Sequence, residues 1–269
     1  MKIILIVIIL LFPIYLFLIA PRMHKHADRT PFMKHHYAHR GLFDNNSDAP
    51  ENSLLAFQKA VDAGYGIELD VQLSKDNQLV IFHDATLKRM CGKDGKVWEY
   101  TLKELQQMKL ANSEQTIPTF QDFLKIVDGK VPFILEYKLD RAQTKVCELA
   151  NEALKSYNGP YCIESFHPLA LLWYRKNRPD VLRGQLSEEF FREEKNKGKP
   201  ILTLGSFLLF NFAGRPDFIA YNHLHANNIS RRICKMLGAL SVTYTIKSKD
   251  EYKKNKKNFD LFIFDSCRL

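Results

Sequence analysis

Two histidines, an arginine and several carboxylates fall close together in the first third of the sequence, at or just after short strand-like runs. Glu68 and Asp70 are separated by one residue in an extended run, so both carboxylates point to one face, where their hard oxygens can hold Mg²⁺ or Ca²⁺. His39 and His83 could flank such an ion as base and acid, because imidazole titrates near neutral pH. This combination of side chains suits the chemistry of phosphate esters.

The elements that must position these side chains are short apolar runs, which alternate with helical patterns along the chain. Such alternation predicts a parallel sheet with crossover helices, and eight runs predict an α/β fold of the TIM-barrel type. The expected strands are residues 36–41, 67–72, 133–137, 161–165, 181–186, 218–221, 241–246 and 261–264. A further run, 79–82, is expected to extend from the barrel and carry His83 to its rim. The last barrel helix is expected to be missing, because the sequence stops at Leu269.

The position of the polar residues along these strands is an independent indication of a site. Barrel active sites lie at the carboxyl ends of the strands. Residues 39–40 end the first expected strand, residues 68–70 lie in the second, and residues 136–138 end the third, so they converge on one mouth. His167 and His223 follow later strands and could reach the same mouth.

Five short motifs occur in a fixed order along the first half of the chain. They read His-Arg-Gly at 39–41, Pro-Glu-Asn at 50–52, Glu-x-Asp-Val at 68–71, His-Asp at 83–84 and Glu-x-Lys at 136–138. In order and spacing they resemble the glycerophosphodiester phosphodiesterase family, and the resemblance covers roughly residues 35–266. Tyr244 and Lys247 depart from the Trp and Asn that the family commonly has on the substrate wall. These departures concern the preferred leaving group rather than the chemistry.

The resemblance implies a metal-dependent enzyme that splits glycerophosphodiesters into glycerol 3-phosphate and an alcohol, with a glycerol hydroxyl attacking first to give a cyclic phosphate. His39 would deprotonate the attacking hydroxyl, and His83 would protonate the leaving alkoxide. The expected ligands of Mg²⁺ or Ca²⁺ are Glu68, Asp70 and Glu136, and the expected substrate-binding residues are Arg40, Lys138 and Glu51. For Glu51, a purely structural role as a charge at a helix N-terminus is an equal alternative.

Two other functions remain open at this point. One is a lysophospholipase D, or another lipid phosphodiesterase on a similar barrel; the other is a catalytically silent, membrane-tethered barrel that binds phosphorylated ligands. The complete set of histidines and carboxylates favours an enzyme over a silent barrel. Residues 206–212 are unusually apolar and are expected to pack against the barrel. If they insert into a lipid surface instead, lysophospholipids become plausible substrates.

The amino terminus carries an uninterrupted apolar run, residues 3–20, about as long as a membrane-spanning helix minimally needs. We expect residues 1–20 to form an uncleaved single-pass anchor, followed by a polar linker, 21–34, and a catalytic domain, 35–269.

A cleaved secretory signal is the alternative for this run, since a basic residue leads it and Ala20 ends it. Leu18 and Pro21 make the bond after Ala20 a poor cleavage site, however. Because large trailing domains translocate largely regardless of charge, the catalytic domain is expected on the extracytoplasmic side.

The composition narrows the range of partners. The formal net charge of +9 would suit nucleic acid, but aromatic residues are sparse in the basic runs and no nucleic-acid-binding module is visible. An anionic membrane is the better expected partner. The five cysteines are widely scattered without metal-type spacing, so neither a zinc site nor a disulfide framework is expected.

Overall fold

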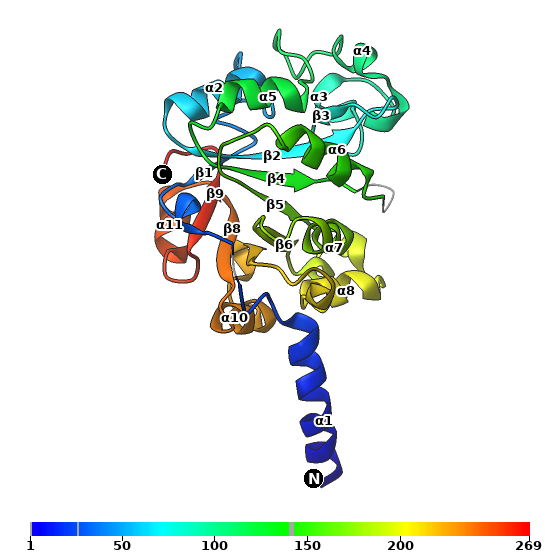
Figure 1. Cartoon of the computed structure of the whole chain (residues 1–269), viewed down its shortest axis with the longest axis vertical. Helices are drawn as coiled ribbons and strands as arrows, with labels where there is room; N and C mark the ends of the chain where they lie inside the picture. The colour runs from blue at the N-terminus through cyan, green and yellow to red at the C-terminus, as the bar shows by residue number, and fades with distance from the viewer. Residues whose placement is uncertain (1, 26, 140–142) are drawn as a thin grey trace.

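Eight parallel strands form a closed barrel in the computed structural model, which describes residues 2–25, 27–139 and 143–269 (Figure 1). Each strand pairs with the next around the ring, and β1 pairs with both β2 and β9, which closes the seam. The strands are β1 (Tyr37–His39), β2 (Gly66–Leu73), β4 (Phe133–Tyr137), β5 (Tyr161–Ser165), β6 (Arg183–Ser187), β7 (Phe218–Asn222), β8 (Leu240–Ile246) and β9 (Leu261–Phe264). All eight apolar runs are therefore strands, and the predicted TIM barrel is confirmed.

Six of the helices surround the barrel in Figure 1 and cover the outer face of its strands. They are α2 (Leu54–Asp62), α5 (Phe120–Val127), α6 (Lys145–Leu154), α7 (Pro168–Asn177), α10 (Ile229–Met236) and α11 (Lys249–Asn255). Several begin at a side chain that accepts a hydrogen bond from the first turn: Ser53 accepts from Ala56 N in α2, and Thr119 from Asp122 N in α5. Each such cap contributes about 1 kcal/mol and fixes where its helix starts.

The connection between β2 and β4 forms a small lobe with its own apolar core (Figure 1). Its elements are β3 (Leu79–Ile81), α3 (Lys88–Cys91), the short 3₁₀ turn η2 (Val97–Glu99) and α4 (Leu102–Leu105). Because β3 runs antiparallel to β2, residues directly after β3 return towards the carboxyl half of the barrel. His83 occupies this position, as the sequence predicts.

A second long connection links β6 to β7. It contains η3 (Phe190–Arg192), η4 (Glu194–Asn196), α8 (Pro200–Ser206) and α9 (Asn211–Gly214). Within the apolar segment 206–212, the side chains of Ser206, Leu208 and Asn211 are buried, and Leu208 belongs to the main apolar core. Phe212 stays partly exposed.

The linker lies beneath the amino-terminal end of the barrel. Phe32 is the last residue of η1 (Thr30–Phe32). Its side chain is buried in the interior cluster that contains the first residues of several strands, among them Phe218 and Leu261. The Tyr37 hydroxyl donates to the Phe32 carbonyl at 3.0 Å, which ties the linker to the start of β1. Phe32 therefore closes the floor of the barrel, opposite the predicted mouth.

Residues 265–269, which follow β9, contain no helix. Rings from neighbouring elements cover β9 instead: His36 packs edge-on against Phe262, and Tyr65 packs against Phe264. The Tyr65 hydroxyl also donates to the Leu269 carbonyl at 2.8 Å.

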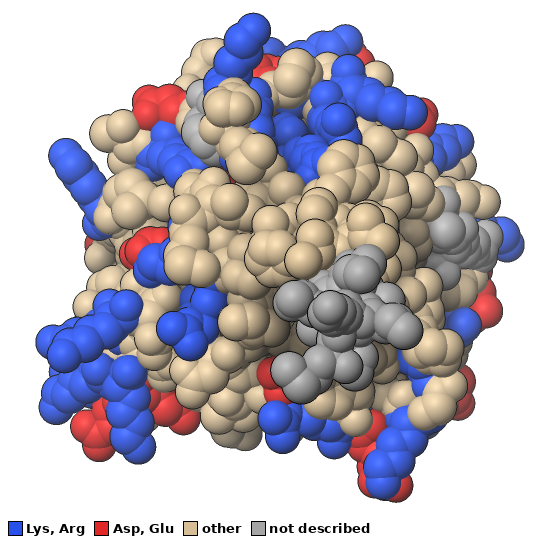
Figure 2. All heavy atoms as spheres, turned by 90° about the horizontal axis from the view of Figure 1, so that it is seen from below, with Lys and Arg blue, Asp and Glu red and all other residues tan. Residues whose placement is uncertain are grey.

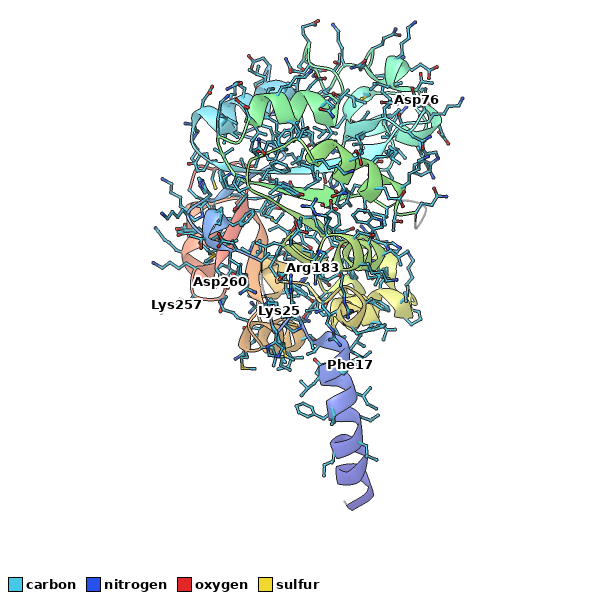
Figure 3. All side chains as sticks on the ribbon, in the orientation of Figure 1. Phe17, Lys25, Asp76, Arg183, Lys257 and Asp260 are labelled. Carbon is cyan, nitrogen blue, oxygen red and sulfur yellow. The ribbon has the colours of Figure 1, made fainter. Side chains whose placement is uncertain are left out.

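Helix α1 (Lys2–Ile19) projects from the barrel next to α8 and α10 (Figure 1). Its last turns are attached to the barrel: the Tyr15 hydroxyl is 2.7 Å from Ser230 Oγ, and the Ile19 carbonyl accepts from Asn211 Nδ2 at 2.9 Å. Phe17 marks the point where the helix meets the barrel, and Arg215 lies over its ring (Figure 3). Within the described residues, no helix combines the length and hydropathy that crossing a membrane requires. The membrane anchor therefore stays a prediction.

Candidate active site

Three buried carboxylates form the centre of the mouth. Asp70 on β2 lies opposite Glu136 on β4 in the strand register, and Glu68 is one side-chain repeat earlier on β2. One oxygen from each lies within 4.8 Å of the others, so the three could hold a single metal ion. The i, i+2 spacing expected from the sequence does place Glu68 and Asp70 on the same face, and pairing with β4 adds Glu136.

The three carboxyl groups differ in the direction in which their pKa values are shifted. Burial raises the pKa of Glu68 well above its usual range, and the neighbouring Asp70 adds to the shift. Burial likewise raises the pKa of Glu136. Although burial opposes ionisation of Asp70, Lys138 and other cations hold its pKa well below its usual range. The ammonium of Lys138 lies 2.9 Å from Asp70 Oδ1 and 2.5 Å from Glu136 Oε1, so it partly neutralises the cluster.

The donor set fits a divalent cation. Oxygen is the ligand atom that Mg²⁺ and Ca²⁺ prefer, and all three side chains supply carboxylate oxygen. Asp70 Oδ1 and Glu136 Oε1 are buried, and both lie next to the Lys138 ammonium. One ammonium does not offset three buried carboxylates, so a divalent cation among them would stabilise their charged forms.

His39 ends β1 beside this cluster. Its Nδ1 is 3.2 Å from Asp265 Oδ2, and its Nε2 is 3.9 Å from Glu68 Oε2. Burial, with the Arg40 guanidinium next to it, lowers the pKa of His39 to about 4. A neutral imidazole at pH 7 can accept a proton, which is what a general base must do.

His83 lies in the small lobe, near enough to Asp70 and Glu136 to affect their charges. Its Nδ1 is 2.7 Å from Asp84 Oδ1, and Arg89 Nε donates to Asp84 Oδ2 at 2.6 Å. Gln72 holds the loop that carries His83, because its Nε2 donates to the carbonyls of Phe82 and Asp84 at 2.8 and 2.9 Å. The second predicted histidine is therefore fixed at the rim by a carboxylate and by backbone hydrogen bonds.

Arg40 lies among the acidic groups and is oriented by Glu51. Its Nη1 donates to Glu51 Oε1 at 2.6 Å, and its Nε lies 3.6 Å from Asp70 Oδ2. Arg89 binds both oxygens of Glu51, at 2.6 and 2.8 Å. Although burial opposes ionisation, Arg89 and Arg40 lower the pKa of Glu51 to about 2. Both Glu51 oxygens thus already have cationic partners, which places Glu51 behind Arg40 rather than in the carboxylate cluster.

Left-handed backbone at two non-glycine residues shapes the loops around the site. Arg40 has φ of 57° and Asn52 has φ of 58°, conformations that are costly for residues with a side chain. They direct Arg40 N to Glu68 Oε2 at 3.2 Å and Asn52 Nδ2 to Asp70 Oδ2 at 2.9 Å. At Gly41 a Cβ would lie 2.8 Å from the backbone of Ala56, so the His-Arg-Gly motif needs glycine at its last position.

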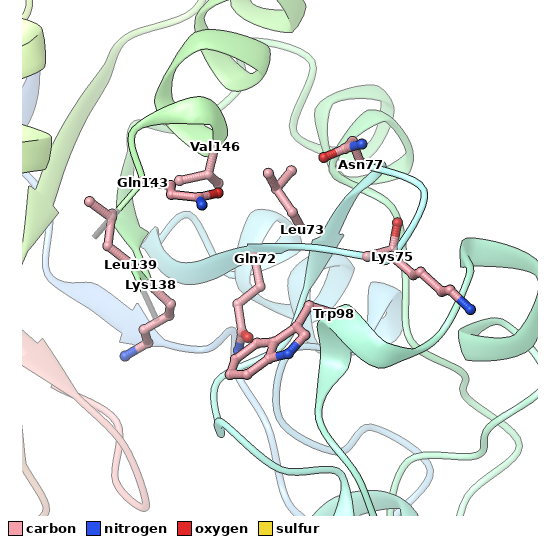
Figure 4. A pocket seen from close by; sticks show the side chains of 10 residues that line it. Gln72, Leu73, Lys75, Asn77, Trp98, Lys138, Leu139, Gln143 and Val146 are labelled. Atoms are coloured by element: carbon pink, nitrogen blue, oxygen red, sulfur yellow. The ribbon is translucent and has the colours of Figure 1, made fainter. Parts of the chain in front are cut away.

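An apolar cavity of about 530 Å³ has Glu136 and Lys138 in its wall. Most of the remaining wall is apolar, including Phe166, Phe190 and Leu202. A much smaller cavity, about 120 Å³, lies between β2 and the start of α6, next to Trp98 (Figure 4). Lys138 lines both cavities, and in Figure 4 its ammonium turns away from the small one.

The two other histidines near the mouth have different surroundings. His167 Nδ1 accepts a hydrogen bond from Leu169 N at 3.2 Å, so His167 caps α7. His223 begins the short turn η5 (His223–His225), and its Nε2 is 4.0 Å from Glu251 Oε2. Neither is joined to the carboxylate cluster by a contact within the described residues.

Sequence reasoning did not assign roles to Asp265, Arg89 or Asn52. Asp265 follows the last strand directly, so the rule that barrel sites lie at the carboxyl ends of strands could have found it. Asn52 belongs to the Pro-Glu-Asn motif. Arg89 lies in the small lobe, and nothing in its sequence neighbourhood indicates that its side chain reaches Glu51.

Comparisons with known proteins agree with this geometry. A glycerophosphodiester phosphodiesterase of Bacillus altitudinis is 31% identical over 157 residues, which cover 54% of this chain but only 63% of the relative. A phosphodiesterase of Oleispira antarctica, solved in complex with the product sn-glycerol-3-phosphate, has the same fold, with a TM-score of 0.69, 23% identity and coverage of 86% of this chain and 92% of the other. A glycerophosphodiester phosphodiesterase of Thermotoga maritima aligns with a TM-score of 0.64 and 25% identity, covering 90% and 96% of the two chains.

The family assignment follows from a match that includes nearly the whole barrel. The profile of the glycerophosphoryl diester phosphodiesterase family matches residues 39–267, from the first predicted catalytic histidine to Cys267 in the tail after β9. The chain therefore belongs to the glycerophosphoryl diester phosphodiesterase family.

Proposed function

We propose that this protein is a metal-dependent phosphodiesterase that hydrolyses glycerophosphodiesters to glycerol 3-phosphate and an alcohol. The observation that carries the proposal is the cluster of Glu68, Asp70 and Glu136, with His39 3.9 Å from Glu68 and His83 close enough to affect the charge of Asp70. Family membership and the bound product of the Oleispira antarctica neighbour support the same chemistry.

The charge of the substrate determines what the site must supply. A phosphodiester anion would be repelled by three carboxylates alone. Glu68, Asp70 and Glu136 would hold a divalent cation, which when bound supplies positive charge that polarises a non-bridging phosphate oxygen. Arg40 and Lys138 add fixed positive charge at the same mouth, and Glu51 keeps the Arg40 guanidinium in place.

Two proton transfers complete the first step. His39 takes the proton of a glycerol hydroxyl as its oxygen attacks phosphorus, and His83 gives a proton to the alkoxide as the bond to the leaving alcohol breaks. The product of this step is a cyclic phosphate, and water then opens it with the two histidines in exchanged roles. The hydrogen bond with Asp265 orients His39 for this task, and Asp84 orients His83.

We also propose that residues 1–20 hold the enzyme on a membrane as a single-pass anchor, with the barrel on the extracytoplasmic side. The length and apolar character of the sequence support this proposal. Figure 2 views the face from which α1 projects: uncharged residues fill much of what the grey atoms leave visible, and many Lys and Arg, with some Asp and Glu, lie around them. Basic residues around an apolar face favour contact with anionic lipid.

The proposed activity can be tested with the purified full-length chain in detergent. Glycerophosphocholine, glycerophosphoethanolamine and glycerophosphoglycerol are incubated with it in the presence of Mg²⁺, Ca²⁺ or a chelator, and released glycerol 3-phosphate is measured. We expect release only when a divalent ion is present. If no substrate is turned over under any condition while phosphodiesters still bind, the non-catalytic, ligand-binding barrel becomes the better description.

A further inference from the structure

We propose that a cavity at the junction of α1 and the barrel binds the phosphate of an anionic phospholipid head group. This junction cavity has a volume of about 620 Å³, and its wall comes from α1, the linker, α7 and the first residue of β6. Because Arg183 begins β6, the cavity lies at the amino-terminal end of the barrel, opposite the mouth that holds the carboxylates. The inference goes beyond the proposed hydrolysis and rests on the proposed anchor only for the source of the phosphate.

The wall of the junction cavity is strongly basic. Within the described residues it contains no Asp or Glu, but it contains four arginines, namely Arg22, Arg175, Arg183 and Arg215. Asp217 lies behind them and is shared: its Oδ1 is 3.5 Å from Arg22 Nη1, and its Oδ2 is 3.7 Å from Arg183 Nη1. One shared carboxylate does not offset four guanidiniums, so the cavity keeps a net positive charge.

Backbone carbonyls hold the guanidiniums in place without neutralising them. Arg22 Nη1 donates to the Pro179 carbonyl at 2.8 Å. Arg215 Nη1 donates to the Ala20 carbonyl at 2.9 Å, and Arg183 Nε donates to the Gly214 carbonyl at 2.7 Å. A guanidinium carries five N–H groups, more than these neutral acceptors take up. The arginines are therefore preorganised, and their charge remains to be met by an anion.

Arg183 is the buried member of the set. Its side chain is 3% exposed, and its Nη1 has no hydrogen-bond partner among the described residues. Burial lowers the pKa of Arg183 to about 10, and Arg22 and Arg175 add to the shift against the effect of Asp217. A buried cation that is only partly compensated is costly, so an anion in the cavity would stabilise its charged form.

The chemistry of the wall points to phosphate, and its surroundings point to a lipid. Clustered guanidiniums suit phosphate, because each can place two N–H groups on two phosphate oxygens. The rest of the wall includes the apolar side chains of Leu16 and Phe17 on α1 and of Leu237 after α10. In Figure 3, Phe17 and Arg183 lie where the helix meets the barrel. The cavity thus has a basic side and an apolar side.

The position along α1 matches the level of lipid head groups. Side chains further along the helix remain exposed, with Leu10 at 63% and Ile14 at 55%, and would lie among acyl chains if α1 anchors the protein. The junction cavity lies at the carboxyl end of the same helix, where the chain would leave the bilayer. Basic groups at this level attract anionic head groups. A phospholipid beside α1 can place its phosphate in the cavity and its acyl chains along the helix.

Isothermal titration of the purified full-length chain in an uncharged detergent tests the inference. A chelator prevents metal-dependent turnover, and without a cation the three carboxylates at the mouth repel anions. The ligands are short-chain phosphatidylglycerol, short-chain phosphatidylcholine, whose choline cancels the phosphate charge, and inorganic phosphate. We expect phosphatidylglycerol to bind with a Kd at least about 10-fold lower than either of the others. Inorganic phosphate that binds as tightly would overturn the lipid as the source of the anion.

Three variants locate the binding. Arg175→Gln and Arg22→Gln each remove one of the four charges and should raise the Kd for phosphatidylglycerol about 5-fold. Arg232→Gln is the matched control: Arg232 is exposed on α10 and does not line the cavity, so its Kd should equal that of the parent. Thermal unfolding without lipid checks the fold of each variant, and the two cavity variants lie on different elements, so either can decide. Equal affinities for all four proteins would overturn the inference.

Hydrolysis is measured separately, so that the two proposals can fail independently. With a divalent ion, Arg175→Gln should hydrolyse glycerophosphocholine at the rate of the parent, because the cavity is at the opposite end of the barrel. If no diester is hydrolysed but phosphatidylglycerol binding still depends on Arg175, the proposed hydrolysis fails and the inference stands. A mature chain that begins near Pro21 would lack Leu16 and Phe17 of the wall and would overturn the inference together with the anchor.

Discussion

Asp265 Oδ2 lies 3.2 Å from Nδ1 of His39, across the seam where β9 meets β1. The imidazole of His39 lowers the pKa of Asp265 against the opposing effect of burial, so Asp265 is a carboxylate that accepts a hydrogen bond. His39 must then carry its proton on Nδ1, which leaves the lone pair of Nε2 directed to the carboxylate cluster. Closure of the barrel thus places a histidine from the first strand beside a carboxylate from the last.

The first prediction concerns this pair. Asp265→Asn should lower kcat by about 10- to 100-fold with little change in KM, because the amide can donate to Nδ1 and stabilise the wrong tautomer. Steady-state kinetics on glycerophosphocholine measures the effect. The control is Asp250→Asn on α11, where the carboxylate is 82% exposed, and it should retain the activity of the parent. Equal kinetics for the two variants would remove Asp265 from the mechanism.

The second prediction concerns the two histidines themselves. His39→Ala and His83→Ala should each lower kcat by at least about 10²-fold, the usual scale for general acid–base groups. Metal binding should survive both changes, because neither ring is among the three carboxylate ligands. Isothermal titration with Mg²⁺ or Ca²⁺ checks this in parallel with the kinetics. Near-native turnover in either variant would show that the histidine concerned does not transfer a proton.

The sequence predicts the barrel well because its strands leave a strong local signal. Each of the eight strands is a short apolar run, and most are followed by a helical pattern; buried parallel strands are apolar on both faces. The ligand residues could be predicted for the same reason: Glu68 and Asp70 are polar residues within such a run, and Glu136 is near the end of another.

The position of Asp265 after a strand could have placed it at the mouth, but which side chains pair with each other could not be predicted, because pairing depends on how the chain folds back on itself. His39 and Asp265 are 226 positions apart, and only closure of the barrel brings them together. Arg89 contacts Glu51 from the small lobe, whose fold depends on its own apolar core. No periodic pattern in the sequence indicates this contact. The sequence allowed the apolar segment 206–212 either to pack against the barrel or to insert into a lipid surface. Leu208 of this segment is buried, which favours packing against the barrel.

The third prediction is metal dependence. A chelator should abolish turnover, and adding Mg²⁺ or Ca²⁺ at about 100 times its Kd should stabilise the fold by about 2.7 kcal/mol. Asp70→Asn should lose both responses, because Asp70 is the carboxylate whose charge the surrounding cations sustain. Glu164→Gln is the matched control: it is buried on β5 opposite Glu136 but lies outside the three-carboxylate set. Full activity of metal-stripped protein would contradict the predicted metal dependence.

The fourth prediction is a pH dependence of stability that arises from Glu51. Its pKa is about 2 in the folded protein against 4.5 ordinarily, a depressed value, so its contribution is present above pH 4.5 and is lost as pH falls towards 2. When the pH is lowered from 6 to 3, the free energy of unfolding of the parent protein should fall by about 2 kcal/mol more than that of Glu51→Gln. Urea unfolding of both proteins at the two pH values measures the difference. Glu114→Gln, at an 87% exposed position, should follow the parent, and a Glu51→Gln curve that does the same would contradict the assignment.

The last prediction separates the anchoring part of α1 from its attached end. Removing residues 2–13 should abolish membrane sedimentation and leave kcat and Tm nearly unchanged, because Tyr15 and Ile19 keep their contacts with Ser230 and Asn211. Removing residues 2–20 should also release the protein but lower its Tm by about 3 °C or more, since the fully buried Ile19 side chain is worth about 1.5–3 kcal/mol.

Cell fractionation, amino-terminal sequencing and thermal unfolding of the three forms provide the measurements. Asn211 Nδ2 and Cys234 Sγ both donate to the Ile19 carbonyl, and Arg215 donates to the Ala20 carbonyl, so only the longer deletion leaves these donors without acceptors. A full-length protein that remains with the membrane and keeps its amino terminus supports the anchor. A mature chain that begins near Pro21 in the soluble fraction would instead identify residues 1–20 as a cleaved signal, and the Tm of that form should then match the longer deletion rather than the shorter one.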